Sequence, residues 1–268
     1  MNCDEWNQKC GDVVEKMKEH VKTFTTPISK ALTHNEGEHL GSASFINVAG
    51  SIYIVTNEHV ANETNYASRA HQYHGATDVV RLLNPVYAKP YPIDFAVSKI
   101  HEKSWTACSH NANGIPESRF AKKHDPVTGE LLFFMGYSGE RSKFLFGTLF
   151  APGTPYLTQE IEFPSGLDIG DNKFHFALPY LTEKAWAVDG NTRGLPDPHG
   201  MSGSIVWNTK FIETTQKGQA WNPELAVVTG IIWGWPSSVG CLIATRVEHL
   251  DITSMATSAE KRAKQLDR

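Results

Sequence analysis

Cysteine is scarce in this sequence, and long apolar runs are missing. The 268 residues hold four cysteines, at positions 3, 10, 108 and 241, and no two of them have the CxxC spacing of a metal or redox site. This density excludes a disulfide-stapled fold, and we expect free thiols in a reducing compartment. No stretch approaches the ~20 apolar residues that a bilayer-spanning helix needs, so we expect a soluble protein with no membrane partner.

Clusters of one charge are also missing. Lys and Arg number 25 against 29 Asp and Glu, a formal net charge of -4, and the basic residues are scattered along the chain. A nucleic-acid partner needs a basic patch, so none is predicted. The first six residues, MNCDEW, are polar and acidic where a secretory signal is basic and then apolar. We therefore expect a cytoplasmic protein.

The sequence does contain enough apolar residues for one large domain, since 40% of its 268 residues are hydrophobic. Apolar side chains recur every three to four residues over 4–24 and again over 247–268, which predicts an amphipathic helix near each end. From about residue 40, short β-branched runs alternate with Gly, Asn and Pro turn signals. About ten strands are predicted, as in a pair of barrels or a sandwich.

A glycine-rich turn stands before the apolar run that starts at Ile205. Gly200 and Gly203 flank Ser202, and these small residues let the backbone curl so that the amides of Gly200 and Ser202 point at one spot. Two converging amides are what a developing oxyanion needs. Taken alone, the run is equally typical of an ordinary β-turn.

A serine nucleophile needs a base, and His59 is the histidine best placed to serve. It ends an apolar β run, whereas six other histidines lie in polar stretches and are expected on the surface, at positions 34, 39, 71, 74, 110 and 124. The base in turn needs a carboxylate that holds its tautomer. Asp94 opens an apolar strand, a costly place for an unpaired charge, and Asp78 before Val79 is the second candidate.

Three segments together resemble the motifs of the chymotrypsin-like (trypsin-fold) serine peptidases. They are TNEHVA at 56–61, DFAV at 94–97 and GMSGS at 200–204. Their order, histidine, then aspartate, then serine, is the chymotrypsin-type order and differs from that of subtilisin-like and α/β-hydrolase enzymes. The resemblance extends over roughly residues 38–250.

This resemblance implies an all-β fold of two six-stranded barrels, with the active site in the cleft between them. We expect a helical extension over 1–35 and a peptidase domain over 36–268. Within that domain the expected bounds are about 38–115 for barrel 1, about 125–250 for barrel 2 and about 247–268 for a C-terminal helix.

The resemblance also implies a serine endopeptidase that acts on a protein or peptide without a metal or cofactor. Ser202 would form the acyl-enzyme, His59 would act as general base and acid, and Asp94 would orient His59. The amides of Gly200 and Ser202 would form the oxyanion hole. The absence of the family's usual disulfides points to an intracellular, bacterial-type member.

The chain departs from the family's pattern around the nucleophile. Met201 stands where secreted members have the aspartate of the zymogen ion pair, so that switch cannot operate. Pro196 stands where trypsin-like members have the aspartate that selects Lys or Arg. Asp197 could serve a basic side chain if the loop is shifted, and His199 could face an acidic one.

Two tryptophans, Trp233 and Trp235, are expected to line the substrate pocket or to pack in the core. The family's wall serine, which bonds the triad aspartate, is replaced by Ile232 or Trp233. These departures leave open a catalytically inactive trypsin-fold binding module, and an esterase of the same mechanism. The N-terminal helix either packs on a barrel or receives a regulatory partner.

Overall fold

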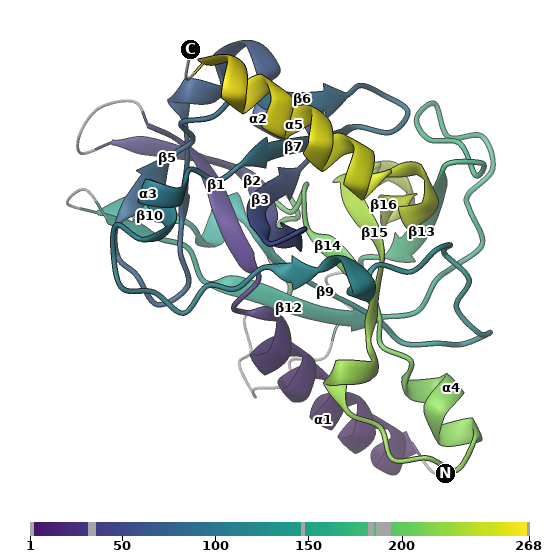
Figure 1. Cartoon of the computed structure of the whole chain (residues 1–268). Helices are drawn as coiled ribbons and strands as arrows, with labels where there is room; N and C mark the ends of the chain where they lie inside the picture. Colours follow the sequence, from purple (N-terminus) through teal and green to yellow (C-terminus); the bar gives the residue numbers. More distant parts are fainter. Residues whose placement is uncertain (1–2, 32–35, 146–147, 182–184, 186–193, 267–268) are drawn as a thin grey trace.

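A computed structural model describes residues 3–31, 36–145, 148–181, 185 and 194–266 of the chain. In this part of the chain, two antiparallel sheets curl into half-barrels, with one helix, α1 (Cys3–Val21), at the lower end of Figure 1 and another, α5 (Ile252–Leu266), across its upper part. None of the described helices has the length and apolar character that crossing a bilayer requires.

The first sheet has the strand order β5-β4-β1-β2-β3-β7-β6, and β8 pairs with β2 in parallel. Its strands are β1 (Thr25–Ala31), β2 (Gly37–Val48), β3 (Ser51–Thr56), β4 (Arg69–Gln72), β5 (Val79–Arg81), β6 (Val86–Lys89), β7 (Phe95–Lys99) and β8 (Ile115–Pro116).

The second sheet has the order β12-β9-β14-β15-β16-β13, and β10 and β11 form a separate hairpin. The strands are β9 (Leu132–Tyr137), β10 (Lys143–Leu145), β11 (Thr148–Phe150), β12 (Gly153–Thr158), β13 (His175–Pro179), β14 (Ile205–Asn208), β15 (Val227–Gly234) and β16 (Cys241–Arg246). The predicted double barrel with terminal helices is confirmed. The described part has six strands in the second sheet but eight in the first.

Short helices occupy several connections. They are α2 (Glu58–Ala61), α3 (Glu102–Trp105) and α4 (Phe211–Gln216), with 3-10 turns η1 (Glu63–Ser68), η2 (Glu117–Arg119), η3 (Gly139–Arg141), η5 (Pro223–Leu225), η6 (Ser237–Val239) and η7 (Val247–His249).

The strand period of two explains how the two sheets share one core. Along β3, Ile54 packs inside the first half-barrel, while Tyr53 and Val55 on the other face join a cluster common to both sheets. In β9, Phe134 likewise lies inside the second half-barrel and Phe133 joins the common cluster. Such strands are buried on both faces, so both halves are held by one apolar interface.

The N-terminal helix α1 buries its apolar positions, Val13, Val14, Met17 and Val21, against the common cluster. The helical extension that we expected over 1–35 is wrong beyond Val21. Residues Thr25–Ala31 form β1, which pairs with both β2 and β4. The reason is local, because β-branched threonines and a proline follow Phe24 and favour an extended chain.

The C-terminal helix α5 lies on β6 and β7 of the first sheet, as Figure 1 shows. Its buried residues, Ile252, Met255, Ala256, Ala259 and Ala263, follow the predicted three-to-four spacing. Glu260 on this helix accepts hydrogen bonds from Lys99 Nζ (3.2 Å) and from the Tyr53 hydroxyl (3.2 Å). The helix thus ties two strands of the first sheet together from outside.

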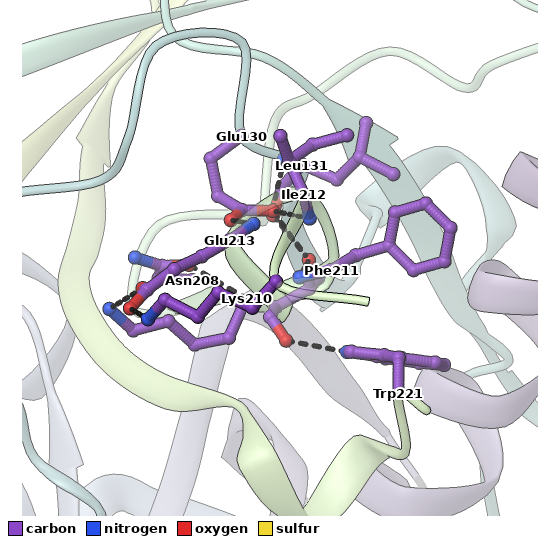
Figure 2. Close-up of polar contacts among 10 residues, drawn as sticks. Glu130, Leu131, Asn208, Lys210, Phe211, Ile212, Glu213 and Trp221 are labelled. Carbon is purple, nitrogen blue, oxygen red and sulfur yellow. Dashed lines mark hydrogen bonds and ion pairs between the residues drawn. The ribbon is translucent and has the colours of Figure 1, made fainter. Parts of the chain in front are cut away.

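A buried carboxylate holds the connection between β14 and β15. Glu130 is 2% exposed, and its oxygens accept the amides of Leu131 (2.9 Å), Ile212 (2.9 Å) and Glu213 (3.0 Å). Figure 2 shows this carboxylate at the first turn of α4, where helical amides lack partners. The indole of Trp221 donates to the carbonyl of Thr209 (2.7 Å) and closes the same connection.

Two histidines that we expected on the surface are buried. His71 is 1% exposed and packs against Phe45 and Tyr73, and His124 is 3% exposed and bonded to Glu160 and Thr229. Polar neighbours in sequence misled here, because tertiary packing decides burial: His71 is enclosed where β4 pairs with β1 and β5, and His124, which lies outside the strands, bonds to Thr229 of β15. The remaining members of that set are half-buried at positions 39, 74 and 110, while position 34 lies outside the described residues.

Candidate active site

Sheet pairing brings His59 and Asp94 together. β3 and β7 are antiparallel neighbours with Thr56 opposite Ala96, so the end of β3 lies beside the start of β7. His59 follows β3 in α2, and Asp94 directly precedes β7. Asp94 Oδ2 lies 2.6 Å from His59 Nδ1, and Asp94 Oδ1 accepts the His59 amide at 3.1 Å.

The two partners differ in exposure. The Asp94 side chain is 7% exposed, whereas the His59 side chain is 49% exposed. Because the Asp94 carboxylate can only accept, Nδ1 carries a proton that points at it, and in the neutral ring the lone pair is then on Nε2. Asp78, the second candidate, is exposed before the edge strand β5 and has no bond to His59 among the described residues.

Ser202 lies on a turn that only glycine flanks could form. Gly200 and Gly203 have φ of +94° and +92°, in the region that disfavours any residue with a Cβ. A Cβ on Gly203 would overlap the carbonyl oxygen of Ser42 in β2. The glycines therefore serve both the local turn and its close approach to the first sheet.

This approach places Ser202 against the segment that carries His59. The Ser42 amide donates to the Ser202 carbonyl at 2.7 Å. A Cβ on Gly41 would lie 3.0 Å from the Ser202 carbonyl oxygen and 2.7 Å from the side chain of Val60, which follows His59 in α2. Ser202 and His59 thus come from opposite sheets to the same region.

The Ser202 hydroxyl does not bond to His59 in this structure. It donates to the carbonyl of Trp233 in β15 at 3.3 Å. The amides of Gly200 and Ser202 have no acceptor among the residues that the structure describes, whereas the Met201 amide between them donates to Pro198 (2.9 Å). Two unpaired amides beside a serine hydroxyl can bind an oxyanion.

Two residues that sequence reasoning missed support this turn from β2. The Ser42 hydroxyl donates to the Gly200 carbonyl at 2.8 Å. His39 Nε2 donates to the Tyr137 carbonyl at 2.8 Å, and its ring lies against Gly200, where a Cβ would be 2.5 Å from Nε2. Burial lowers the pKa of His39, although the Tyr137 and Gly200 carbonyls oppose this, so the ring is neutral. Nothing in the local sequence marks either residue.

The five expected specificity residues do not form one group. Asp197 Oδ1 accepts the amide of His199 (2.8 Å) and also contacts His199 Nδ1. The His199 ring, 80% exposed, stands edge-on to Trp235 at 5.3 Å between centroids. The Pro196 carbonyl accepts the Tyr180 hydroxyl at 2.7 Å.

The Trp233 ring instead contacts the rings of Tyr91 (5.8 Å between centroids) and His175 (5.0 Å). Burial would raise the pKa of Asp197, but its bonds from His199 lower it. Asp197 is therefore charged and already occupied by His199. Among the described residues, no group of three or more His, Cys, Asp or Glu side chains is arranged to hold a metal ion.

Comparison with known proteins finds likeness in fold and not in sequence. No protein-family model matches the sequence, and no curated protein matches it. An inactivated protease paralogue of the scabies mite superposes with a TM-score of 0.56 at 11% identity, covering 92% of this chain and 98% of that chain. This likeness confirms the trypsin-like double-barrel fold, and at such identity it concerns the fold alone.

Two other solved structures are similar at a lower score. A protease of M. tuberculosis in its active form has 14% identity and a TM-score of 0.48, covering 94% of this chain and 86% of that one. A catalytically inactive tobacco etch virus protease, complexed with substrate, has 11% identity and a TM-score of 0.48, covering 91% and 87%.

Proposed function

We propose that this chain is a serine endopeptidase that cleaves a protein or peptide substrate through an acyl-enzyme on Ser202. The 2.6 Å contact between His59 Nδ1 and Asp94 Oδ2, with Ser202 brought to the same region from the other sheet, carries the proposal. A histidine tethered at Nδ1 by a buried carboxylate is suited to take a proton at Nε2.

Attack begins with rotation of the Ser202 hydroxyl away from the Trp233 carbonyl and toward His59 Nε2. Such bonds are often absent without substrate and form in the Michaelis complex. His59 takes the hydroxyl proton as Ser202 Oγ attacks the scissile carbonyl, and Asp94 stabilises the resulting imidazolium. His59 then gives the proton to the leaving amine, and the same steps with water release the acid.

The amides of Gly200 and Ser202 stabilise the oxyanion of each tetrahedral intermediate. The turn that presents them is held by Ser42 and His39 without an ion pair. Met201, in place of a zymogen aspartate, is fully buried with Val206 and Ile232 in the core of the second half-barrel. We therefore expect an enzyme that is competent without proteolytic activation.

A catalytically inactive binding module is the second candidate. The observation that favours it is the bond from the Ser202 hydroxyl to the Trp233 carbonyl, which withholds the nucleophile from His59. The scabies mite protein of similar fold is itself described as an inactivated protease paralogue.

One experiment separates these candidates. Wild type, Ser202→Ala and Ser254→Ala are incubated with a fluorophosphonate probe and, separately, with an unstructured protein substrate. Ser254 is an exposed serine on α5 and serves as the matched control. We expect labelling and cleavage by wild type and Ser254→Ala, and a loss of turnover on the order of 10⁶-fold in Ser202→Ala.

Equal labelling of wild type and Ser202→Ala would remove Ser202 from the mechanism. No labelling and no cleavage by folded wild type would favour the binding module. Turnover of small esters without cleavage of any peptide would instead indicate an esterase.

A further inference from the structure

The backbone that presents Asp94 is strained and held at three successive carbonyls. Asp94 has φ of +47°, which a residue with a Cβ rarely adopts. The carbonyl of Pro92 accepts His175 Nε2 (2.7 Å), that of Ile93 accepts the Thr245 hydroxyl (3.0 Å), and that of Asp94 accepts Asn57 Nδ2 (2.7 Å). Asn57 directly follows β3 of the first sheet, and strands of the second sheet supply the other two donors.

The two donors of the second sheet form a pair. His175 in β13 and Thr245 in β16 are directly opposite each other in the strand register, so their side chains project from the same face. Both residues are 0% exposed. Burying a polar side chain is costly unless its bonds are made, and both make theirs to the loop before Asp94.

The donor atom of His175 is determined by its other neighbour. The Asp171 amide donates to His175 Nδ1 at 2.8 Å, so the ring proton lies on Nε2 and points at Pro92. Burial lowers the pKa of His175, against the opposing influence of the Pro92 carbonyl and Asp171, and keeps the ring neutral. The ring is thus a preset donor toward the Asp94 loop.

The carboxylate of Asp94 has no separate support. Among the described residues its oxygens accept only from His59, at the amide and at Nδ1. Within the loop, the amides of Ile93 and Asp94 both donate hydrogen bonds to the Pro90 carbonyl (3.1 and 3.2 Å). These bonds shape the turn but do not anchor it to the barrels. The direction of the carboxylate therefore depends on the carbonyls that precede it.

We propose that His175 and Thr245 are positioning residues, which clamp the Pro92 and Ile93 carbonyls so that the Asp94 carboxylate meets His59. This inference rests on the proposed function and deepens it. The clamp makes the geometry of a pair within the first sheet depend on the second sheet.

Thr245→Val tests the clamp, because it removes the hydroxyl and keeps the β-branched shape. Thr245→Ser restores the hydroxyl, and Thr229→Val is the matched control. Thr229 is 1% exposed, lies in neighbouring β15 and bonds to His124 at 2.6 Å, away from Asp94. The control thus exchanges the same hydroxyl for a methyl group at an equally buried position of the same sheet.

We expect Thr245→Val to lower kcat on a peptide substrate about ten-fold with KM unchanged. Complete loss of the aspartate's action on its histidine lowers kcat about 10⁴-fold. The Thr245 bond is one of two clamp bonds, so its removal should cost only a part of that factor. Thr245→Ser recovers most of the rate, and Thr229→Val keeps the kcat of wild type. Equal kcat in Thr245→Val and Thr229→Val would overturn the proposal.

A second readout does not need turnover. The proton between His59 Nδ1 and Asp94 Oδ2 is followed by NMR in nitrogen-15-labelled protein, wild type and each variant. Its signal should weaken or shift in Thr245→Val and stay in place in Thr229→Val. If wild type shows no Ser202-dependent cleavage, the proposed function fails, and this signal alone still decides the clamp: an unchanged signal in Thr245→Val refutes it.

Discussion

Replacing Glu130 with glutamine removes the carboxylate whose oxygens accept hydrogen bonds from the first amides of α4. Glu130 Oε1 accepts from Leu131 (2.9 Å), Ile212 (2.9 Å) and the Thr209 hydroxyl (3.3 Å), and Oε2 accepts from Glu213 (3.0 Å). The amide oxygen of glutamine can replace Oε1. Its NH₂ group then stands where Oε2 was and faces the Glu213 amide, so two donors meet.

The expected loss follows from these contacts. Loss of the bond to Oε2 leaves the Glu213 amide an unpaired donor, which costs about 1–3 kcal/mol. The helix N-terminus also loses its attraction to the carboxylate charge, about 0.3–1 kcal/mol. We expect Glu130→Gln to lower the free energy of unfolding by about 1–4 kcal/mol.

Glu213→Gln, on the same helix, is the control. The Glu213 side chain is 28% exposed and pairs with Lys210 and Lys217, both at 2.7 Å. Hydrogen bonds from these lysines lower the pKa of Glu213 to about 2, yet ion pairs at the surface contribute only about 0–1 kcal/mol. The same substitution there should cost less than about 1 kcal/mol.

Urea unfolding at neutral pH, followed by tryptophan fluorescence, measures both variants. Trp207 is 1% exposed and reports on loss of the core. The midpoint shift at constant slope gives the change in unfolding free energy, provided that unfolding is two-state. If Glu130→Gln proves as mild as Glu213→Gln, the carboxylate is not what holds this connection.

Three further outcomes follow from the structure. Gly203→Ala should lower the free energy of unfolding by several kcal/mol and abolish cleavage, because its Cβ would overlap a carbonyl of β2. Gly50→Ala is the control: Gly50 has φ of +81° with no atom within 4 Å, so the change should cost about 1 kcal/mol in the same unfolding assay. Burial lowers the pKa of His71 to about 3, whereas the unfolded chain takes up that proton near pH 6.5. Stability is therefore lost as the pH is lowered from about 6.5 toward 3. His71→Phe should therefore lose about 2 kcal/mol less than wild type between pH 7 and pH 5, and an equal loss would contradict the assignment. Asp94→Asn should lower kcat by about 10⁴-fold while Asp78→Asn leaves it unchanged, as steady-state cleavage of a peptide would measure.

Much of the fold was predictable because its signals are local. Alternating β-branched runs and turn residues marked the strands, and three-to-four spacing marked both terminal helices. The prediction failed at β1, where residues after Val21 join the first sheet although the preceding residues are helical. It also failed at His71 and His124, since polar neighbours in sequence do not reveal which side chains the packing of distant segments encloses.

By itself, the sequence determined which residues are candidates for chemistry. Ser202 is marked by glycines whose positive φ its turn requires, His59 by its place at the end of a β run, and Asp94 by a charge that opens a buried strand. Each mark lies within a few residues of the group it identifies, so it can be read without knowing the fold.

Only the tertiary structure decided what holds these groups. Ser42 supports the turn that carries Ser202 from another sheet, and His175 and Thr245 reach the Asp94 loop from strands far away in sequence. In the tertiary structure the Ser202 hydroxyl also donates to the Trp233 carbonyl. Such contacts depend on strand register and on the packing of two half-barrels, and neither is written in the immediate neighbours of a residue.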